Sequence, residues 1–202
     1  MASGGSKTRQ KILDAALDLV LAYGYSGTSI DRVIGVAGIT KGTFFYHFDS
    51  KAQLALALVE QFAENDERSL RDTLAEAESH SDDPLGQVLT FVELFEKKMS
   101  GLTGPHPGCL FASYLTESEL FDEQTLDIAR KAMELWRTVL GAKLAEVIET
   151  HPPKVQVDPQ SLADVITVVF EGSFILSKTY RDPDVISDHL AHYRRYLELL
   201  FD

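Results

Sequence analysis

Residues 28–51 read TSIDRVIGVAGITKGTFFYHFDSK, and this stretch decides the fold. Its apolar residues are spaced for a short helix that begins after Thr28 or Ser29, either of which can cap it, and that ends at Gly38. A second short helix follows, with Thr40 as its cap. Two short helices joined by a glycine-containing turn have the layout of a helix-turn-helix, whose second helix enters the major groove of DNA. The same layout also occurs in helical proteins that bind no DNA.

The segments on either side of this stretch also read as helices. Residues 7–23 place their apolar side chains on one stripe and are followed by glycine. Residues 1–6, MASGGS, lack the apolar core of a secretory signal and are expected to form a disordered arm. Ser50 and Gln53 have the spacing of a capping box, which opens a fourth helix that runs to the polar stretch 79–84.

The remainder of the chain predicts further helices, and no segment alternates as a strand does. Helical patterns separated by glycine, proline and polar residues cover residues 84–100, 109–120, 122–150, 159–180 and 183–201. The prediction is an all-α protein of about nine helices. A three-helix DNA-binding domain is expected at residues 1–50 and a larger helical-bundle domain at residues 51–202.

The composition is that of a folded protein of the cytoplasm. The net charge is −12, but residues 1–51 carry +2 and the remainder −14, so a mildly basic segment precedes a strongly acidic body. No window approaches the roughly eighteen unbroken apolar residues of a membrane span, and no membrane partner is expected. The single cysteine cannot form an internal disulfide, which fits a reducing compartment.

Beyond the layout, the residues themselves resemble the N-terminal signature of the TetR family of transcriptional regulators. The resemblance is carried by TSIDRVI at 28–34, AGITKGTFFYHF at 37–48 and SK at 50–51, followed by Leu54. It implies a C-terminal domain for ligand binding and dimerisation. It also implies a homodimer that binds a palindromic operator on double-stranded DNA as a repressor and is released by a small-molecule effector.

The resemblance also implies which residues contact DNA. They are Thr28, Ser29, Thr40, Lys41, Gly42, Thr43, Phe45, Tyr46, His47 and Lys51. Thr28 and Ser29 are expected at phosphates and can also act as simple caps, and both roles can hold. Lys41 suits a guanine edge or a phosphate. Phe45 departs from the family, which commonly has tyrosine there, so a hydroxyl contact is lost and a thymine methyl contact remains.

Two helices at the C-terminus predict the dimer interface. Residues 162–176 are apolar nearly all round, whereas residues 186–200 carry one apolar stripe. The resemblance implies that these two helices pack against those of the second copy as a four-helix bundle. The alternative is that both helices complete a single core. Glu171 is unusual within the apolar helix and must pair, face the second copy or meet a ligand.

Aromatic and apolar residues of the inner helices are candidates for binding an apolar or aromatic effector. They are Phe91, Phe95, Phe111, Tyr114, Met133, Trp136, Phe170 and Phe174. Trp136 and Tyr114 stand out, because a buried indole N–H or phenol hydroxyl wants a partner that a ligand can supply. The alternative is that these side chains are ordinary core.

Other chemistry finds little support in the sequence. Cys109 is expected at a helix N-terminus, where the thiolate is favoured, so it is either a redox sensor or an inert thiol. His106 with Cys109, and His189 with His192, supply no full ligand set, so no metal or cofactor is expected. No catalytic constellation is present. The rival interpretation is a helical small-molecule-binding protein or enzyme without DNA binding.

Overall fold

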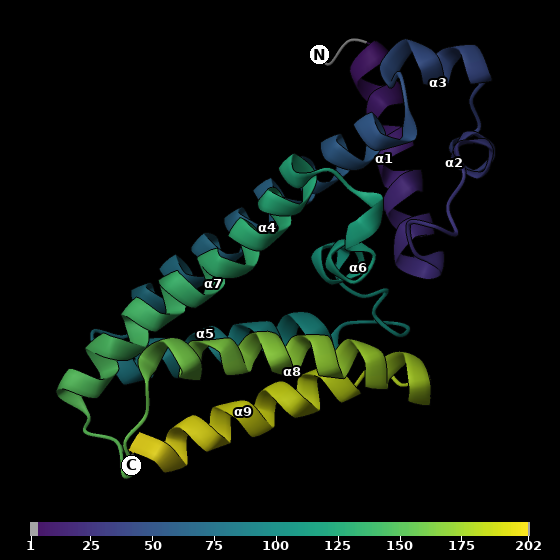
Figure 1. Ribbon diagram of the computed structural model, residues 1–202. Helices are drawn as coiled ribbons and strands as arrows, with labels where there is room; N and C mark the ends of the chain where they lie inside the picture. Colours follow the sequence, from purple (N-terminus) through teal and green to yellow (C-terminus); the bar gives the residue numbers. More distant parts are fainter. Residues whose placement is uncertain (1–3, 202) are drawn as a thin grey trace. The chain divides into compact units, whose positions relative to one another are not determined.

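The computed structural model describes residues 4–201, most of which are helical (Figure 1). The α-helices are α1 (Gly4–Tyr23), α2 (Ile30–Ala37), α3 (Lys41–His47), α4 (Lys51–His80), α5 (Pro84–Ser100), α6 (Leu110–Thr116), α7 (Glu123–Thr150), α8 (Pro159–Tyr180) and α9 (Val185–Phe201). A 3-10 helix, η1 (Ser118–Leu120), follows α6. No strand occurs among residues 4–201, so the predicted all-α class is confirmed.

The chain divides into two compact units. The N-terminal unit comprises residues 1–65 and 109–132, and the C-terminal unit comprises residues 66–108 and 133–202. The helices α4 and α7 contribute residues to both units. The N-terminal unit also includes α6, which packs against α1. The functional boundary after residue 50 stays a prediction.

The N-terminal unit is organised around the apolar stripe of α1. Ile12, Leu13 and Ala16 are buried, and α1 packs against both α2 and α6. The helix begins at Gly4, earlier than expected, so residues 4–6 of the expected arm are helical. Residues 1–3 lie outside the described part of the chain.

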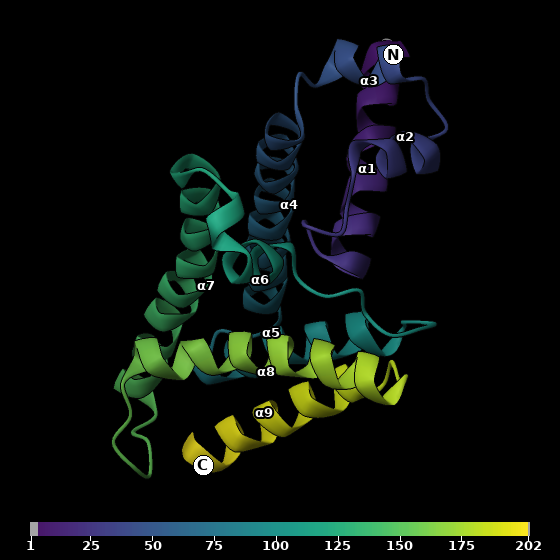
Figure 2. The same ribbon diagram turned by 45° about the vertical axis from the view of Figure 1, so that its right-hand side comes forward.

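The C-terminal unit is built around α9, which packs against α5 and α8, as both views show (Figures 1 and 2). The single stripe expected on the last helix is its buried face: Ile186, Leu190, Tyr193, Leu197 and Leu200. The Tyr193 hydroxyl donates to the carbonyl of Leu162 on α8 at 3.0 Å. This stripe therefore completes the core of its own unit, which is the alternative left open for it above, and the expectation that it faces a second copy is wrong.

Three local predictions are corrected by the structure. The helix expected at residues 109–120 ends at Thr116 and continues as η1. The helix expected from Pro183 begins at Val185. The capping box is shifted, since the Ser50 hydroxyl accepts from the Gln53 N–H as expected, but the Gln53 side chain accepts from the N–H of Asp49.

The helix α8 has an unusual surface. By length and composition alone it is apolar enough to cross a membrane, although only about a quarter of its most apolar window is buried. Val168 and Ile175 are exposed on it, seven residues apart and therefore on one face. An exposed apolar face of this kind calls for a covering partner.

Candidate nucleic-acid interface and aromatic cluster

The turn between α2 and α3 is defined by caps at both of its ends. The Ser29 hydroxyl accepts from the N–H of Arg32 at 3.2 Å and caps α2. Gly38 ends α2 in the left-handed region, at φ 64°, and the Ile39 N–H donates to the carbonyl of Ile34 at 3.2 Å. Of the two candidate caps, Thr28 and Ser29, the structure uses Ser29, and Gly38 ends α2 as predicted.

The helix α3 presents an exposed first turn on a buried anchor. Thr40 caps it by accepting from the N–H of Thr43 at 3.1 Å, as predicted. Phe44 and Phe48 are fully buried and their rings lie 6.0 Å apart. The opposite face is open to solvent, and it carries Lys41, Gly42, Phe45 and Tyr46, with Tyr46 82% exposed. This arrangement is what a recognition helix requires.

Thr28 differs from its expected role at a phosphate. Its side chain is only 3% exposed, and its hydroxyl donates to the carbonyl of Gly24 at 2.9 Å. Its backbone N–H donates to the carbonyl of Tyr25 at 3.1 Å. Both donors are used inside the protein, so Thr28 holds the turn between α1 and α2 while the exposed Ser29 remains the candidate for phosphate binding.

We expect the two neighbours to respond differently to substitution. Thr28→Val should lower the free energy of unfolding by about 1–3 kcal/mol, because it leaves the partly buried Gly24 carbonyl without its donor. Ser29→Ala should cost about 1 kcal/mol as a lost cap and should also weaken DNA binding. Urea denaturation and fluorescence anisotropy with labelled DNA separate the two effects. A Thr28→Val protein that weakens DNA binding as much as Ser29→Ala at equal stability would contradict this division.

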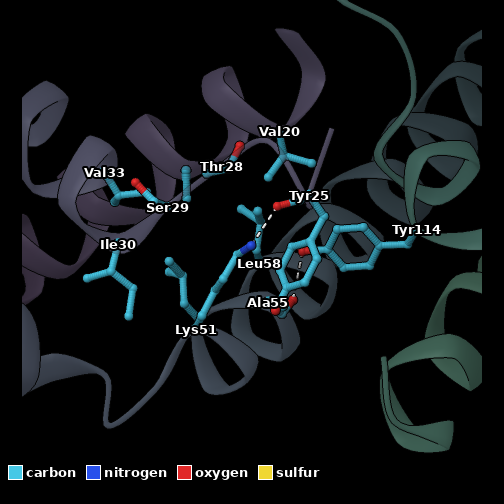
Figure 3. Close-up of a pocket in the computed structure, with 12 residues that line it drawn as sticks. Val20, Tyr25, Thr28, Ser29, Ile30, Val33, Lys51, Ala55, Leu58 and Tyr114 are labelled. Atoms are coloured by element: carbon cyan, nitrogen blue, oxygen red, sulfur yellow. Dashed lines mark hydrogen bonds between the residues drawn. The ribbon is translucent and has the colours of Figure 1, made fainter. Parts of the chain in front are cut away.

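Lys51 is directed into the N-terminal unit (Figure 3). Its Nζ donates to the Tyr25 carbonyl at 2.6 Å and lies 3.8 Å from the centre of the Tyr25 ring. Burial lowers the pKa of the Lys51 ammonium, and the nearby Glu117 carboxylate partly opposes this shift. Lys51 lines a small apolar pocket beneath α2, together with Ile30 and Tyr114. Its contact with Tyr25 shows that it stabilises this unit, whatever it contributes at DNA.

Glu117 is a positioning residue that the sequence interpretation missed. Its carboxylate accepts from the N–H groups of Tyr25 at 2.8 Å and Ser26 at 2.9 Å, so it holds the turn between α1 and α2. Burial alone would raise the pKa of Glu117, but the hydrogen bonds from Ser26 and Tyr25 and the charge of Lys51 outweigh it and lower the pKa. Because Glu117 lies more than ninety residues from this turn, no local pattern reveals the contact.

We expect Glu117→Ala to loosen this turn. Two backbone N–H groups lose a charged acceptor, a change of about 1–2 kcal/mol at a partly exposed site. The folded-state pKa of Glu117 is depressed, so its contribution is present above the ordinary glutamate pKa and is lost as the pH falls through the depressed value. The stability difference between wild type and Glu117→Ala should therefore shrink in acid. A difference that is constant from pH 7 to pH 3 would contradict this role.

Most of the predicted effector residues form one aromatic cluster in the C-terminal unit. The Trp136 ring lies 6.2 Å from Phe91, 5.5 Å from Phe95 and 6.0 Å from Phe170. Phe174 adjoins Phe170 at 5.9 Å. We call these five residues the aromatic cluster. The half-buried Met133 begins the part of α7 that belongs to the same unit.

Two of the predicted effector residues lie elsewhere. Phe111 and Tyr114 are buried in the N-terminal unit, where Phe111 packs edge-on against Phe62 at 4.9 Å. The Tyr114 hydroxyl donates to the carbonyl of Ala55 at 3.2 Å, and burial raises its pKa strongly (Figure 3). The reason for singling out Tyr114, a phenol lacking a partner, was therefore wrong. The indole N–H of Trp136 also has a protein partner, Asp66, at 2.7 Å.

Cys109 is the N-cap residue of α6, which confirms its expected place at a helix start. Its thiol is partly buried. Whether the thiol senses oxidants stays a prediction.

The faces of α8 and α9 form an apolar groove in the C-terminal unit. It contains about 670 Å³ of empty space and is lined by Val165, Val168, Val169, Gly172, Ser173, Leu176, His189, His192, Tyr193 and Tyr196. Val168 is 68% exposed, and Leu199 and Ile175 nearby on the same two helices are exposed to a similar degree. These are the two helices that the sequence assigned to dimerisation.

Comparisons with known proteins agree on one family. The model of bacterial regulatory proteins of the tetR family matches residues 12–58, and that of the tetracyclin repressor-like C-terminal domain matches residues 84–193. The transcriptional regulator AcuR of Cereibacter sphaeroides is 24% identical over 195 residues, which is 96% of this chain and 87% of the relative. The repressor DhaR of Mycobacterium sp. strain GP1 is 24% identical over 184 residues, which is 91% of this chain and 88% of the relative. A TetR family regulator from Agrobacterium tumefaciens has the same fold, with a TM-score of 0.78 at 22% identity, over 98% of this chain and all of that one.

Proposed function

The chain belongs to the tetR family of bacterial regulatory proteins, which bind DNA through a helix-turn-helix, and we propose that it is a repressor that binds a palindromic operator as a homodimer and is released by a small molecule. The observation that carries the proposal is the geometry of α3. Its first turn and outer face are exposed while Phe44 and Phe48 anchor it to the core. A helix held in this way can enter the major groove without unfolding its own unit.

The exposed residues of α2 and α3 divide into two roles. Lys41, Gly42 and Thr43 occupy the first turn of α3 and read base edges, with Gly42 allowing close approach of the backbone. Ser29 at the start of α2, together with Tyr46 and His47, contacts phosphates. Phe45, 42% exposed, adds an apolar contact to a thymine methyl.

The second copy covers the exposed faces of α8 and α9. Val168, Ile175 and Leu199 then pack against their symmetry mates, which explains why α8 is apolar beyond the needs of its own unit. This arrangement suits a regulator dissolved in the cytoplasm, since the apolar face is buried by protein. It also brings two copies of α3 to one operator.

The effector binds in the C-terminal domain and changes the affinity for DNA. The family assignment of residues 84–193 and the aromatic cluster within them support this site. The coupling is reciprocal, so an effector that weakens operator binding by a given factor is itself bound more weakly by that factor when DNA is present.

Selection of bound duplexes from a random library tests DNA binding. The wild type should return a palindrome, and Lys41→Ala should bind it more weakly and relax the preference at one or two base pairs in each half, by about 1–3 kcal/mol per contact. Lys154→Ala removes the same charge from an exposed site in the C-terminal unit and should leave the preference unchanged. Failure of the wild type to enrich any sequence would favour a helical small-molecule-binding protein without DNA binding.

A further inference from the structure

Asp66 is a partly buried carboxylate beside the aromatic cluster. It lies on α4, and its Oδ2 accepts from the indole Nε1 of Trp136 at 2.7 Å. Burial raises the pKa of Asp66, and the hydrogen bond from Trp136 opposes this shift only in part. The indole of Trp136 needs an acceptor here but not a charged one, since a neutral amide could accept the same hydrogen bond and would bury at lower cost than a carboxylate.

The charge of Asp66 has no cationic partner among the residues that the structure describes. Its one polar partner is the neutral indole of Trp136, and none of the ion pairs within residues 4–201 includes Asp66. Two cations lie near the cluster: Lys98 donates to the Thr73 hydroxyl at 2.6 Å and lies 4.8 Å from the centre of the Phe95 ring, and Lys178 lies near His106. A partly desolvated carboxylate without a counter-ion gains stability when a ligand brings one.

The rings beside Asp66 favour the same kind of ligand. Trp136, Phe170 and Phe174 are each partly exposed although they pack against the core. His106 stacks on Phe174 at 4.2 Å, and burial, with the charge of Lys178, lowers its pKa, so it extends the surface as a neutral ring. The faces of such rings carry negative electrostatic potential and attract organic cations.

We propose that the effector of this protein is an organic cation, an ammonium group on an apolar or aromatic skeleton, which Asp66 and Trp136 bind through charge and through the ring face. The proposal rests on the proposed function, since it names the ligand class of its effector site. Apolar skeletons pack on Phe170 and Phe174, and the ammonium group lies against Asp66. The Asp66 carboxylate repels an anion that has the same skeleton. A neutral alcohol with this skeleton packs on the rings but gains no charge interaction.

Trp136 is the single tryptophan of the chain, so tryptophan fluorescence reports directly on this site. The full-length protein, without DNA, is titrated with phenylbutyl-trimethylammonium, 5-phenylpentanol and 5-phenylpentanoate while its fluorescence is measured. The cation should quench Trp136 and bind about tenfold more tightly than the alcohol, or more, with the carboxylate weakest. Equal affinity for cation and alcohol, or no quenching by the cation up to millimolar concentration, would overturn the proposal.

Asp66→Asn tests the carboxylate while keeping an acceptor for Trp136. The variant should lose the preference for the cation, so that its dissociation constant rises about tenfold while that of the alcohol is unchanged. Glu67→Gln is the matched control, because Glu67 is the exposed neighbour on α4 and pairs with Arg71 at 2.8 Å. Asp66→Asn binding the cation as tightly as the wild type would overturn the proposal. Binding of the selected operator is measured separately, so a repressor with another ligand class is distinguished from a cation-binding protein without DNA.

Discussion

Val168→Asp is expected to convert the dimer into a monomer and to lower operator affinity about 100-fold or more. Val168 is 68% exposed and lines the apolar groove of α8 and α9. In the proposed dimer Val168 lies against the same face of the second copy. The substitution would therefore bury two aspartate carboxylates, one from each copy, without partners. A monomer retains one recognition helix and loses the avidity that joins two half-sites, which accounts for the expected loss.

Val155→Asp is the matched control for this prediction. Val155 is 61% exposed between α7 and α8, so the two variants share the residue, the charge change and the starting exposure. Analytical ultracentrifugation should find Val168→Asp monomeric and Val155→Asp dimeric at the same concentration. A Val168→Asp protein that remains dimeric and binds operator normally would show that this face is not the interface between copies.

Phe44→Ala is expected to unfold the helix-turn-helix and abolish DNA binding. Phe44 is fully buried, and its ring contacts those of Phe45 and Phe48. Removing a buried phenylalanine costs about 3–5 kcal/mol, which is a large fraction of the stability of a small unit. The dimer should survive, because its proposed interface lies in the other unit.

Phe45→Ala is the matched control for Phe44→Ala. It removes the same side chain from the same helix, but at an exposed position. Phe45 is 42% exposed, so its truncation should change the free energy of unfolding by less than about 1 kcal/mol and weaken DNA binding moderately. Chemical denaturation, ultracentrifugation and anisotropy with operator DNA measure the three properties. If Phe44→Ala bound operator as well as Phe45→Ala does, α3 would not depend on the buried anchor.

The sequence predicted those features whose causes are local. The caps Ser29 and Thr40 and the stop at Gly38 each act within four residues, and the structure has all three. The apolar stripe of α9 was equally readable, because helical periodicity shows which residues share a face. These local signals fixed the helix-turn-helix and most helix bounds.

The sequence did not reveal features that depend on distant contacts. Lys51 points into the unit because its ammonium group binds the carbonyl and the ring of Tyr25. Glu117 lies where the predicted helix is interrupted, and its carboxylate binds the turn at residues 25–26. Asp66 meets Trp136 seventy residues away. Thr28 and Ser29 look alike in sequence, but only the packing of α1 and α2 decides which hydroxyl is buried.

The affinity for the selected operator, measured across a series of salt concentrations, tests most directly whether the exposed face of α3 binds DNA in two copies. The account predicts two chains per palindromic duplex and a steep loss of affinity with salt, of about three powers of ten or more between 50 and 200 mM for six or more phosphate contacts. Lys41→Ala should bind less tightly at every salt concentration. Binding of one chain per duplex, or affinity that neither salt nor Lys41→Ala changes, would contradict the account.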